Sequence, residues 1–232
     1  MIYPFHSIFL ILYYGQKGEN VKKTLVAALL SLTFAVPLFA SDGGQTPNAQ
    51  SHALALFEQG DSLLQSGKYE EAKKAFTEAI ALNPNYVEAY DSLGKVLMLQ
   101  LKYDEATKEF AKAINLAPDD YTAYFNQGVA YFHLGKYNEV IHNFTEVIRL
   151  YPKNHAAYNI RGIAYFELGK LDDAIRDYTT AIQLNPDYTK AYNNRGIAYL
   201  RQGKTAEAER DFVKSGQPMS EPTGTRLNKC AF

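Results

Sequence analysis

Histidine is the residue type in this chain with the most adaptable chemistry, since its imidazole can bind a metal ion or move a proton near neutral pH. Apart from His6, the histidines are His52, His133, His142 and His155. A zinc site on a helix requires two ligands four residues apart, and none of these four has a histidine or cysteine at that spacing. The sequence therefore predicts structural or surface roles for them, with no metal and no cofactor.

Paired carboxylates are the second group that could do chemistry, as general acids and bases. Three such pairs are Glu70-Glu71, Asp104-Glu105 and Asp172-Asp173. They recur at multiples of 34 residues, each where a helix is expected to begin, and negative charge there complements the helix dipole. The pairs are therefore interpreted as solvated helix starts. No catalytic residue is predicted, and the chain is not expected to be an enzyme.

The elements that carry these residues follow from a strict repeat. Four prolines stand 34 residues apart: Pro84, Pro118, Pro152 and Pro186. Alignment on them gives a column of large apolar residues, Leu56, Tyr90, Tyr124, Tyr158 and Tyr192, and four positions later the glycines Gly60, Gly94, Gly128, Gly162 and Gly196. Three positions further come Leu63, Leu97, Tyr131, Tyr165 and Tyr199. This spacing places all three columns on one helical face, and the glycines indicate points where two helices approach too closely for a side chain.

A second helix follows in each repeat after a turn that contains Gly67, Gly135, Gly169 or Gly203. Its apolar face holds Ala72, Ala106, Val140, Ala174 and Ala208, then Phe76, Phe110, Phe144, Tyr178 and Phe212. The proline ends this helix because it lacks a backbone donor. In the second repeat Leu101 replaces the turn glycine, which costs roughly 1 to 2 kcal/mol if the position is left-handed.

A large residue, then Gly, Tyr, Ala, Phe, Ala and Pro at these spacings resembles the tetratricopeptide repeat. Five units begin near Ala53, Val87, Tyr121, His155 and Thr189, within an array over residues 51–216. The fifth departs from the pattern, because Ser215 stands where alanine is expected and no proline follows in phase. The resemblance implies an all-α fold, a right-handed α-solenoid whose first helices line a concave groove, and it implies protein binding without naming a reaction.

The groove positions of the first helices give the predicted binding residues. These are Phe125, Asn126, Val129, Phe132, Asn159, Ile163, Phe166, Lys190, Asn193, Asn194, Ile197 and Arg201. Apolar pockets would take side chains, and asparagine amides can bond the main chain of an extended peptide. Two alternatives remain open: Phe132, Phe166 and Leu200 could simply pack successive helices together, and the asparagines could be plain solvated surface.

Charge is also graded along the first helices. Glu58, Asp61, Glu88 and Asp91 make the first ones acidic, whereas Lys190 and Arg201, with Arg195 nearby, make the last one basic. We expect the acidic end of a bound peptide to lie toward the fifth repeat, because rim charges steer a partner. The polar clamp by which relatives hold the acidic tails of heat-shock chaperones is not reproduced, since Phe125, Val129 and Ile163 occupy its places.

The N-terminal segment from Val21 to Ser41 resembles a bacterial secretory signal peptide, with two lysines, an apolar stretch and small residues at the end. Residues 1–40 are therefore expected to be an extension and signal, cleaved after Ala40, with the array in the periplasm or secreted. The alternative is an uncleaved membrane anchor over residues 24–40, although that stretch is short for a span. Translation is hypothesised to start at Val21, with a genuine extension Met1–Asn20 as the other interpretation.

Composition excludes a nucleic-acid partner. The chain has 24 basic and 25 acidic residues, and removing residues 1–40 leaves 21 against 24, so phosphate neutralisation cannot drive binding. Residues 41–50 and 217–232 are expected to be a flexible linker and tail. Cys230 is the only cysteine, so no internal disulfide can form; a chance exposed thiol is favoured over pairing with a partner.

These observations predict a non-catalytic scaffold that binds a partner protein or extended peptide in the groove. The alternative is a structural protein that self-associates through its last repeat, where no polar capping helix follows Phe212 and one face would stay wet.

Overall fold

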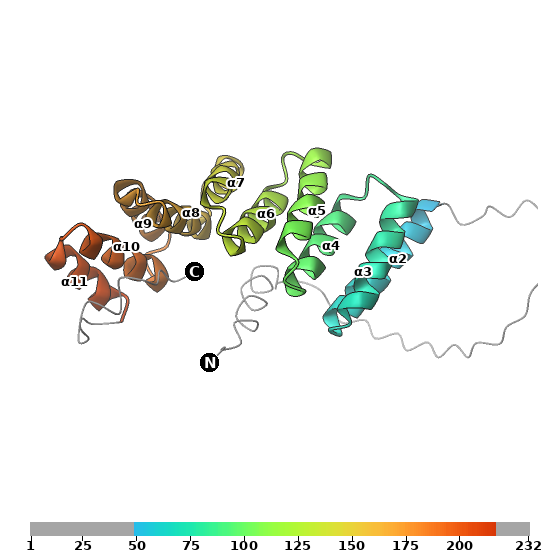
Figure 1. The fold of residues 1–232 in the computed structure, drawn as a ribbon, viewed down its shortest axis with the longest axis horizontal. Helices are drawn as coiled ribbons and strands as arrows, with labels where there is room; N and C mark the ends of the chain where they lie inside the picture. The colour runs from blue at the N-terminus through green and yellow to red at the C-terminus, as the bar shows by residue number, and fades with distance from the viewer. Residues whose placement is uncertain (1–48, 217–232) are drawn as a thin grey trace, which may run out of the picture. The chain divides into compact units, whose positions relative to one another are not determined.

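The computed structural model describes residues 49–216, and the interpretations of residues 1–48 and 217–232 lie outside them. Within the described range the chain forms ten α-helices in five consecutive pairs. The first helices are α2 (Ala49–Gln65), α4 (Val87–Leu99), α6 (Tyr121–His133), α8 (His155–Glu167) and α10 (Thr189–Arg201). The second helices are α3 (Tyr69–Leu82), α5 (Tyr103–Leu116), α7 (Tyr137–Leu150), α9 (Leu171–Leu184) and α11 (Thr205–Lys214). The pairs follow one another in chain order along the array (Figure 1), which confirms the predicted all-α solenoid.

The ends of the helices are where the repeat placed them. α3, α5, α7 and α9 each end two residues before a proline, and the intervening residue is extended (φ between −134° and −141°), as the residue before proline prefers. The turn glycines two residues before the second helices have φ between 68° and 75°. Leu101 has φ 61°, so this leucine is left-handed and the condition under which its position costs roughly 1 to 2 kcal/mol is met.

One tight contact recurs inside every pair. A Cβ built on the glycine of the first helix would lie 2.5 to 2.8 Å from a ring carbon of the aromatic residue sixteen positions later. The five contacts are Gly60 with Phe76, Gly94 with Phe110, Gly128 with Phe144, Gly162 with Tyr178 and Gly196 with Phe212. Each ring is fully buried, so the glycines are required where the two helices touch.

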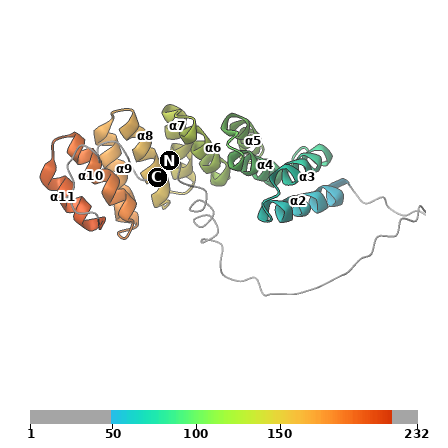
Figure 2. The same ribbon diagram turned by 60° about the horizontal axis from the view of Figure 1, so that its bottom comes forward.

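Neighbouring pairs are joined by apolar side chains. One buried cluster contains Phe76 of α3, Val96 of α4, Phe110 of α5 and Ala130 of α6. Another contains Ile163 of α8, Tyr178 of α9, Ile197 of α10 and Phe212 of α11. Figure 2 shows the same succession of pairs from a second direction. No repeat therefore buries its apolar face alone, as expected of a solenoid.

Candidate protein-interaction surface

The predicted binding residues all lie on first helices, but they differ in exposure. Half of them are buried: Val129, Asn159, Ile163, Phe166, Asn194 and Ile197. Five are half-buried: Phe125, Asn126, Phe132, Lys190 and Asn193. Arg201 is exposed. The structure thus places one part of this set inside the array and another part at its surface.

The apolar members of the set contact one another across repeats. Phe166 and Ile197 belong to one buried cluster, and Phe132 and Leu200 pack against it. Phe125 makes an edge-to-face contact with Phe144 of the second helix in its own repeat, with ring centroids 5.2 Å apart. These side chains therefore contribute to the packing between helices.

The amides form hydrogen bonds between neighbouring first helices. Asn126 Nδ2 donates to Asp91 Oδ1 at 2.7 Å, and Asn194 Nδ2 donates to Asn159 Oδ1 at 2.9 Å. Both bonds join residues 35 positions apart. The two hydrogen bonds join equivalent positions, once between repeats 2 and 3 and once between repeats 4 and 5.

The two acceptors of these bonds differ in their second side-chain atom. Asp91 Oδ2 receives the ammonium of Lys95 at 2.6 Å, one turn further along α4. In α8 the equivalent of Lys95 is Ile163, and Asn159 Nδ2 is buried without a hydrogen-bond partner. A buried unsatisfied donor costs about 1 to 3 kcal/mol, so Asn159 has an unused capacity to bind an acceptor.

The charges of the first helices are partly neutralised. Lys95 pairs with Asp91, and burial raises the pKa of Asp61 while Lys95 opposes that change. At the other end Arg201 lies over the ring of Phe166, 4.8 Å from its centroid. Arg195 does not add to the basic end, because its guanidinium pairs with Asp211 of α11.

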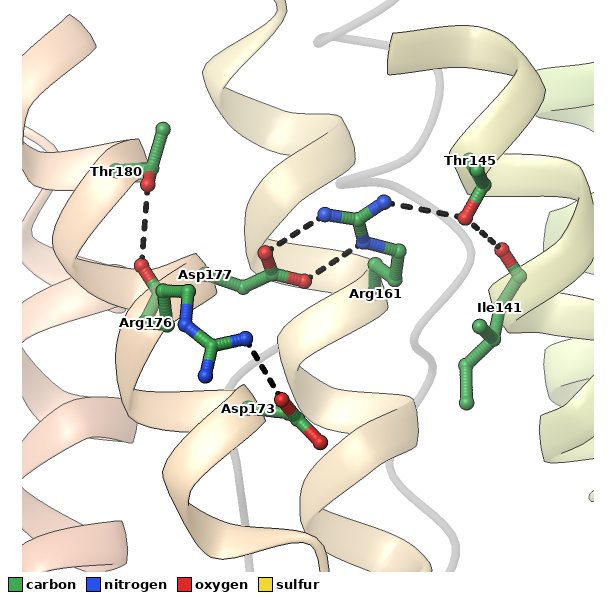
Figure 3. Close-up of polar contacts among 7 residues, drawn as sticks. All are labelled: Ile141, Thr145, Arg161, Asp173, Arg176, Asp177 and Thr180. Carbon is green, nitrogen blue, oxygen red and sulfur yellow. Dashed lines mark hydrogen bonds and ion pairs between the residues drawn. The ribbon is translucent and has the colours of Figure 1, made fainter. Parts of the chain in front are cut away.

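That pairing belongs to an arrangement that the repeat pattern did not predict. Arg161 Nε and Nη2 of α8 donate to both carboxylate oxygens of Asp177 in α9 at 2.8 Å, and Nη1 donates to Thr145 Oγ1 of α7 at 3.1 Å (Figure 3). The guanidinium also lies between two tyrosine rings, 5.7 Å from Tyr158 and 5.9 Å from Tyr165. One side chain thus connects three helices and two repeats.

Repeat 5 repeats this arrangement. Arg195 donates to Asp211 Oδ2 and Oδ1 at 2.7 and 2.8 Å, and to Thr179 Oγ1 at 3.0 Å. We call the Arg161–Asp177–Thr145 and Arg195–Asp211–Thr179 sets the clamps. The signal in the sequence is an arginine just before the first-helix glycine together with an aspartate just before the second-helix aromatic residue.

Two of the histidines, His133 and His155, contact an aromatic ring of a neighbouring repeat. His133 stacks on Tyr103 at 4.6 Å, and His155 meets Tyr188 edge-on at 4.8 Å. Burial lowers the pKa of both imidazoles. Over residues 49–216 there is no group of three or more His, Cys, Asp or Glu side chains that could hold a metal ion. In the same range no helix is long and apolar enough to cross a membrane.

Models of the tetratricopeptide repeat match residues 87–120, 121–154 and 143–176, and a related TPR model matches residues 60–100 and 162–203. The chain belongs to the tetratricopeptide-repeat family. A comparison with the sequences of curated proteins gave no match.

Solved structures of other tetratricopeptide-repeat proteins are similar to this one. A crystal structure of MamA is 27% identical to this chain with a TM-score of 0.68. The match covers 71% of this chain and 90% of the MamA chain. MamA residues 41 to the end from Desulfovibrio magneticus RS-1 give 23% identity and a TM-score of 0.68, covering 71% and 93%. YrrB, described as "a TPR protein with an unusual peptide-binding site", gives 20% identity and a TM-score of 0.64, covering 70% and 84%. The family and these folds support a protein–protein interaction scaffold.

Proposed function

We propose that this tetratricopeptide-repeat protein is a non-catalytic scaffold that binds an extended peptide of a partner protein along the first helices of repeats 3 to 5. The observation that carries the proposal is the buried, unpaired Nδ2 group of Asn159. An extended peptide presents a main-chain carbonyl oxygen at every residue, and this is the acceptor that an asparagine amide can bind.

The surroundings of Asn159 suit such a peptide. Its Oδ1 is already bonded to Asn194, so the side chain is held in one orientation. The half-buried Phe125, Phe132 and Asn193 lie in neighbouring first helices, where they offer apolar and amide contacts. A main-chain carbonyl that reaches Asn159 Nδ2 would form one hydrogen bond and remove one unsatisfied donor.

Direction along the groove is proposed to follow charge. Lys190 and Arg201 are basic and lie on α10, whereas Glu58 and Asp61 lie on α2. An acidic segment of the partner would therefore lie over repeat 5. Replacing Lys190 and Arg201 by glutamate is expected to weaken binding more at low salt than at high salt, because exposed charges are screened; binding that is unchanged at low salt contradicts the direction.

The test is a dissociation constant for a peptide selected from a random library with the full chain. Asn159→Leu keeps the volume of the side chain and removes its polar atoms, and it is expected to weaken binding about tenfold, the equivalent of one good hydrogen bond. Asn143→Leu is the matched control, because Asn143 is also buried and has an unpaired Oδ1, but it lies on the second helix α7. Equal affinity of the Asn159 and Asn143 variants contradicts the proposal.

Self-association through the last repeat is the alternative, and it has less support. Val213 of α11 is 63% exposed, which favours it. However, Gly216 stands where repeat 4 has Ile182, which packs against Ala191 of the following repeat, and Glu209 stands where repeat 4 has Ile175. The face that a further repeat would cover is thus less apolar than the corresponding face of repeat 4. Light scattering that shows a stable oligomer, lost on replacing the exposed Val213 by aspartate (Val213→Asp), would favour the alternative.

Export remains a proposal that rests on the sequence of Val21 to Ser41, outside the described residues. We propose a periplasmic or secreted array, released by cleavage near Ala40, with retention through residues 24–40 as the alternative. The N-terminal residue of the mature protein decides between them: Ser41 supports cleavage, and an intact segment supports the anchor.

A further inference from the structure

We propose that repeat 2 carries a binding site for an arginine side chain presented by a partner protein. The site is a trough between α3 and α5, above α4, with a cavity of about 280 Å³. Its main lining residues are Thr77, Tyr90, Leu93, Glu105, Glu109 and Lys112. The proposal concerns a different face from Asn159 and is independent of the peptide proposed above.

The chain itself shows which group fits this trough, because equivalent residues surround Arg195 where repeats 4 and 5 meet. Tyr90 corresponds to Tyr192, Thr77 to Thr179, and the carboxylate of Glu109 to that of Asp211. The rim also corresponds, with Glu207, Arg210 and Lys214 in the places of Glu105, Lys108 and Lys112. Inside the trough Leu93 stands in the place of Arg195, so repeat 2 has the surroundings of the clamp without its guanidinium.

The polar groups of repeat 2 are oriented for that guanidinium. Thr179 of α9, in the repeat before Arg195, donates from Oγ1 to Ile175 O at 2.7 Å and accepts from Arg195 Nη1. Thr77 of α3, in the repeat before Leu93, donates from Oγ1 to Lys73 O at 2.8 Å in the same way. Its lone pairs therefore point where those of Thr179 receive the arginine, and the ring of Tyr90 can stack on the guanidinium as Tyr192 does.

Lys112 is the group that an incoming arginine must displace. Its ammonium lies 3.0 Å from Glu109 Oε2 and 5.4 Å from the ring centroid of Tyr90. The lysine side chain is 53% exposed, and exposed pairs of this kind contribute little. A cationic rim does not exclude a guanidinium either, because Arg195 pairs with Asp211 in a hollow that Arg210 and Lys214 also line. Arginine is favoured over lysine because its planar fork can bind a carboxylate through two hydrogen bonds.

The test is a titration of the ¹⁵N-labelled full chain, followed by NMR, with N-acetyl-arginine-N-methylamide. The citrulline analogue has the same shape without the charge and is the matched probe. We expect saturable shifts of the Thr77, Tyr90 and Glu109 amides with the arginine probe, and binding at least about tenfold weaker with citrulline. Equal responses to the two probes, or shifts confined to other repeats, overturn the proposal.

Two variants locate the site. Glu109→Gln keeps the shape of the side chain and removes its charge, so it should weaken binding of the arginine probe about tenfold. Glu78 forms an exposed ion pair with Lys74 outside the trough, so Glu78→Gln should leave the affinity for the probe unchanged. Leu93→Arg supplies the missing side chain, as in repeats 4 and 5, and should abolish binding of the probe and raise the melting temperature. Binding that survives Glu109→Gln overturns the proposal, even if Leu93→Arg does not fold.

Discussion

Repeats 4 and 5 hold their helices together differently from repeats 1 to 3. All five repeats share the glycine–aromatic contact within each helix pair. Only repeats 4 and 5 add an arginine–aspartate pair, whose aspartate side chains are 6% exposed. At the same two positions the earlier repeats have Gln59 and Ala75, Leu93 and Glu109, and Gln127 and Asn143.

Repeat 3 shows what a neutral pair does in this place. Gln127 Nε2 donates to Thr107 O at 2.9 Å, and Asn143 Nδ2 donates to Glu139 O at 3.0 Å, so the two amides do not bond each other. Asn143 Oδ1 is left unpaired. The comparison indicates that the glycine and the aromatic ring determine how two helices pair. Gln127 and the clamp arginines all bond to the preceding repeat, and the clamps add a charged pair within their own repeat.

The largest expected effect comes from breaking a clamp on one side only. Arg161→Met leaves the carboxylate of Asp177 buried without a counter-charge, which should cost about 3 to 5 kcal/mol of unfolding free energy. Adding Asp177→Leu should restore most of the loss, because an apolar pair can replace a buried ion pair. Denaturant unfolding followed by circular dichroism measures both.

The matched comparison lies in repeat 2, where Glu109 has no arginine partner and its side chain is 17% exposed. Glu109→Gln should change the unfolding free energy by less than about 1 kcal/mol. If Arg161→Met costs no more than Glu109→Gln, the clamps do not distinguish the two regions.

Leucine in place of the first-helix glycine should be equally harmful in both regions. Gly94→Leu and Gly162→Leu each force side-chain atoms into a ring that a single Cβ already approaches at 2.5 or 2.7 Å. Overpacking of this kind costs at least about 1 to 3 kcal/mol. Thermal melting measures the effect, and a variant that melts like the native chain would show that its helix pair is not formed by this contact.

A gain in stability is expected in repeat 2, where the turn between the two helices has Leu101 in place of the glycine found in the other four repeats. Leu101 has φ 61° and is exposed, so Leu101→Gly relieves strain and should stabilise by about 0.5 to 1 kcal/mol after the entropy cost of glycine. The reverse change, Gly135→Leu, should destabilise repeat 3. A lower melting temperature for Leu101→Gly would mean that the leucine side chain contributes more by packing than its backbone loses.

The smallest effect is a pH dependence at the junctions between repeats. Burial lowers the pKa of His155 below its usual value of 6.5, so the unfolded chain takes up the proton first. The contribution of neutral, buried His155 to the unfolding free energy is present above about pH 6.5 and is lost as the pH falls below that value. Hydrogen exchange measures the stability of each helix separately. Between pH 7 and 5, His155→Gln should reduce the loss of stability more in α8 to α10 than in α4 to α6. An equal change in both regions would contradict a local junction effect.

The sequence predicted the helices and the close glycine contacts, because these depend on spacing within one repeat. It also marked Leu101 as the turn position that would be strained if the backbone there is left-handed. It could not predict which first-helix positions are covered, because that depends on how each repeat rotates against the next. Asn159 and Phe166 are buried for this reason. Arg195 was assigned to the charge of the groove and instead pairs with Asp211, since the columns of the clamps change along the array and do not recur in every repeat.

The central claim, a scaffold that binds along its first helices, is tested most directly by hydrogen–deuterium exchange of the full chain with and without a selected peptide. The account predicts slower exchange in α6, α8 and α10, with α3 and α5 unchanged. Protection confined to the second helices, or no protection with a peptide that saturates the chain, would contradict it.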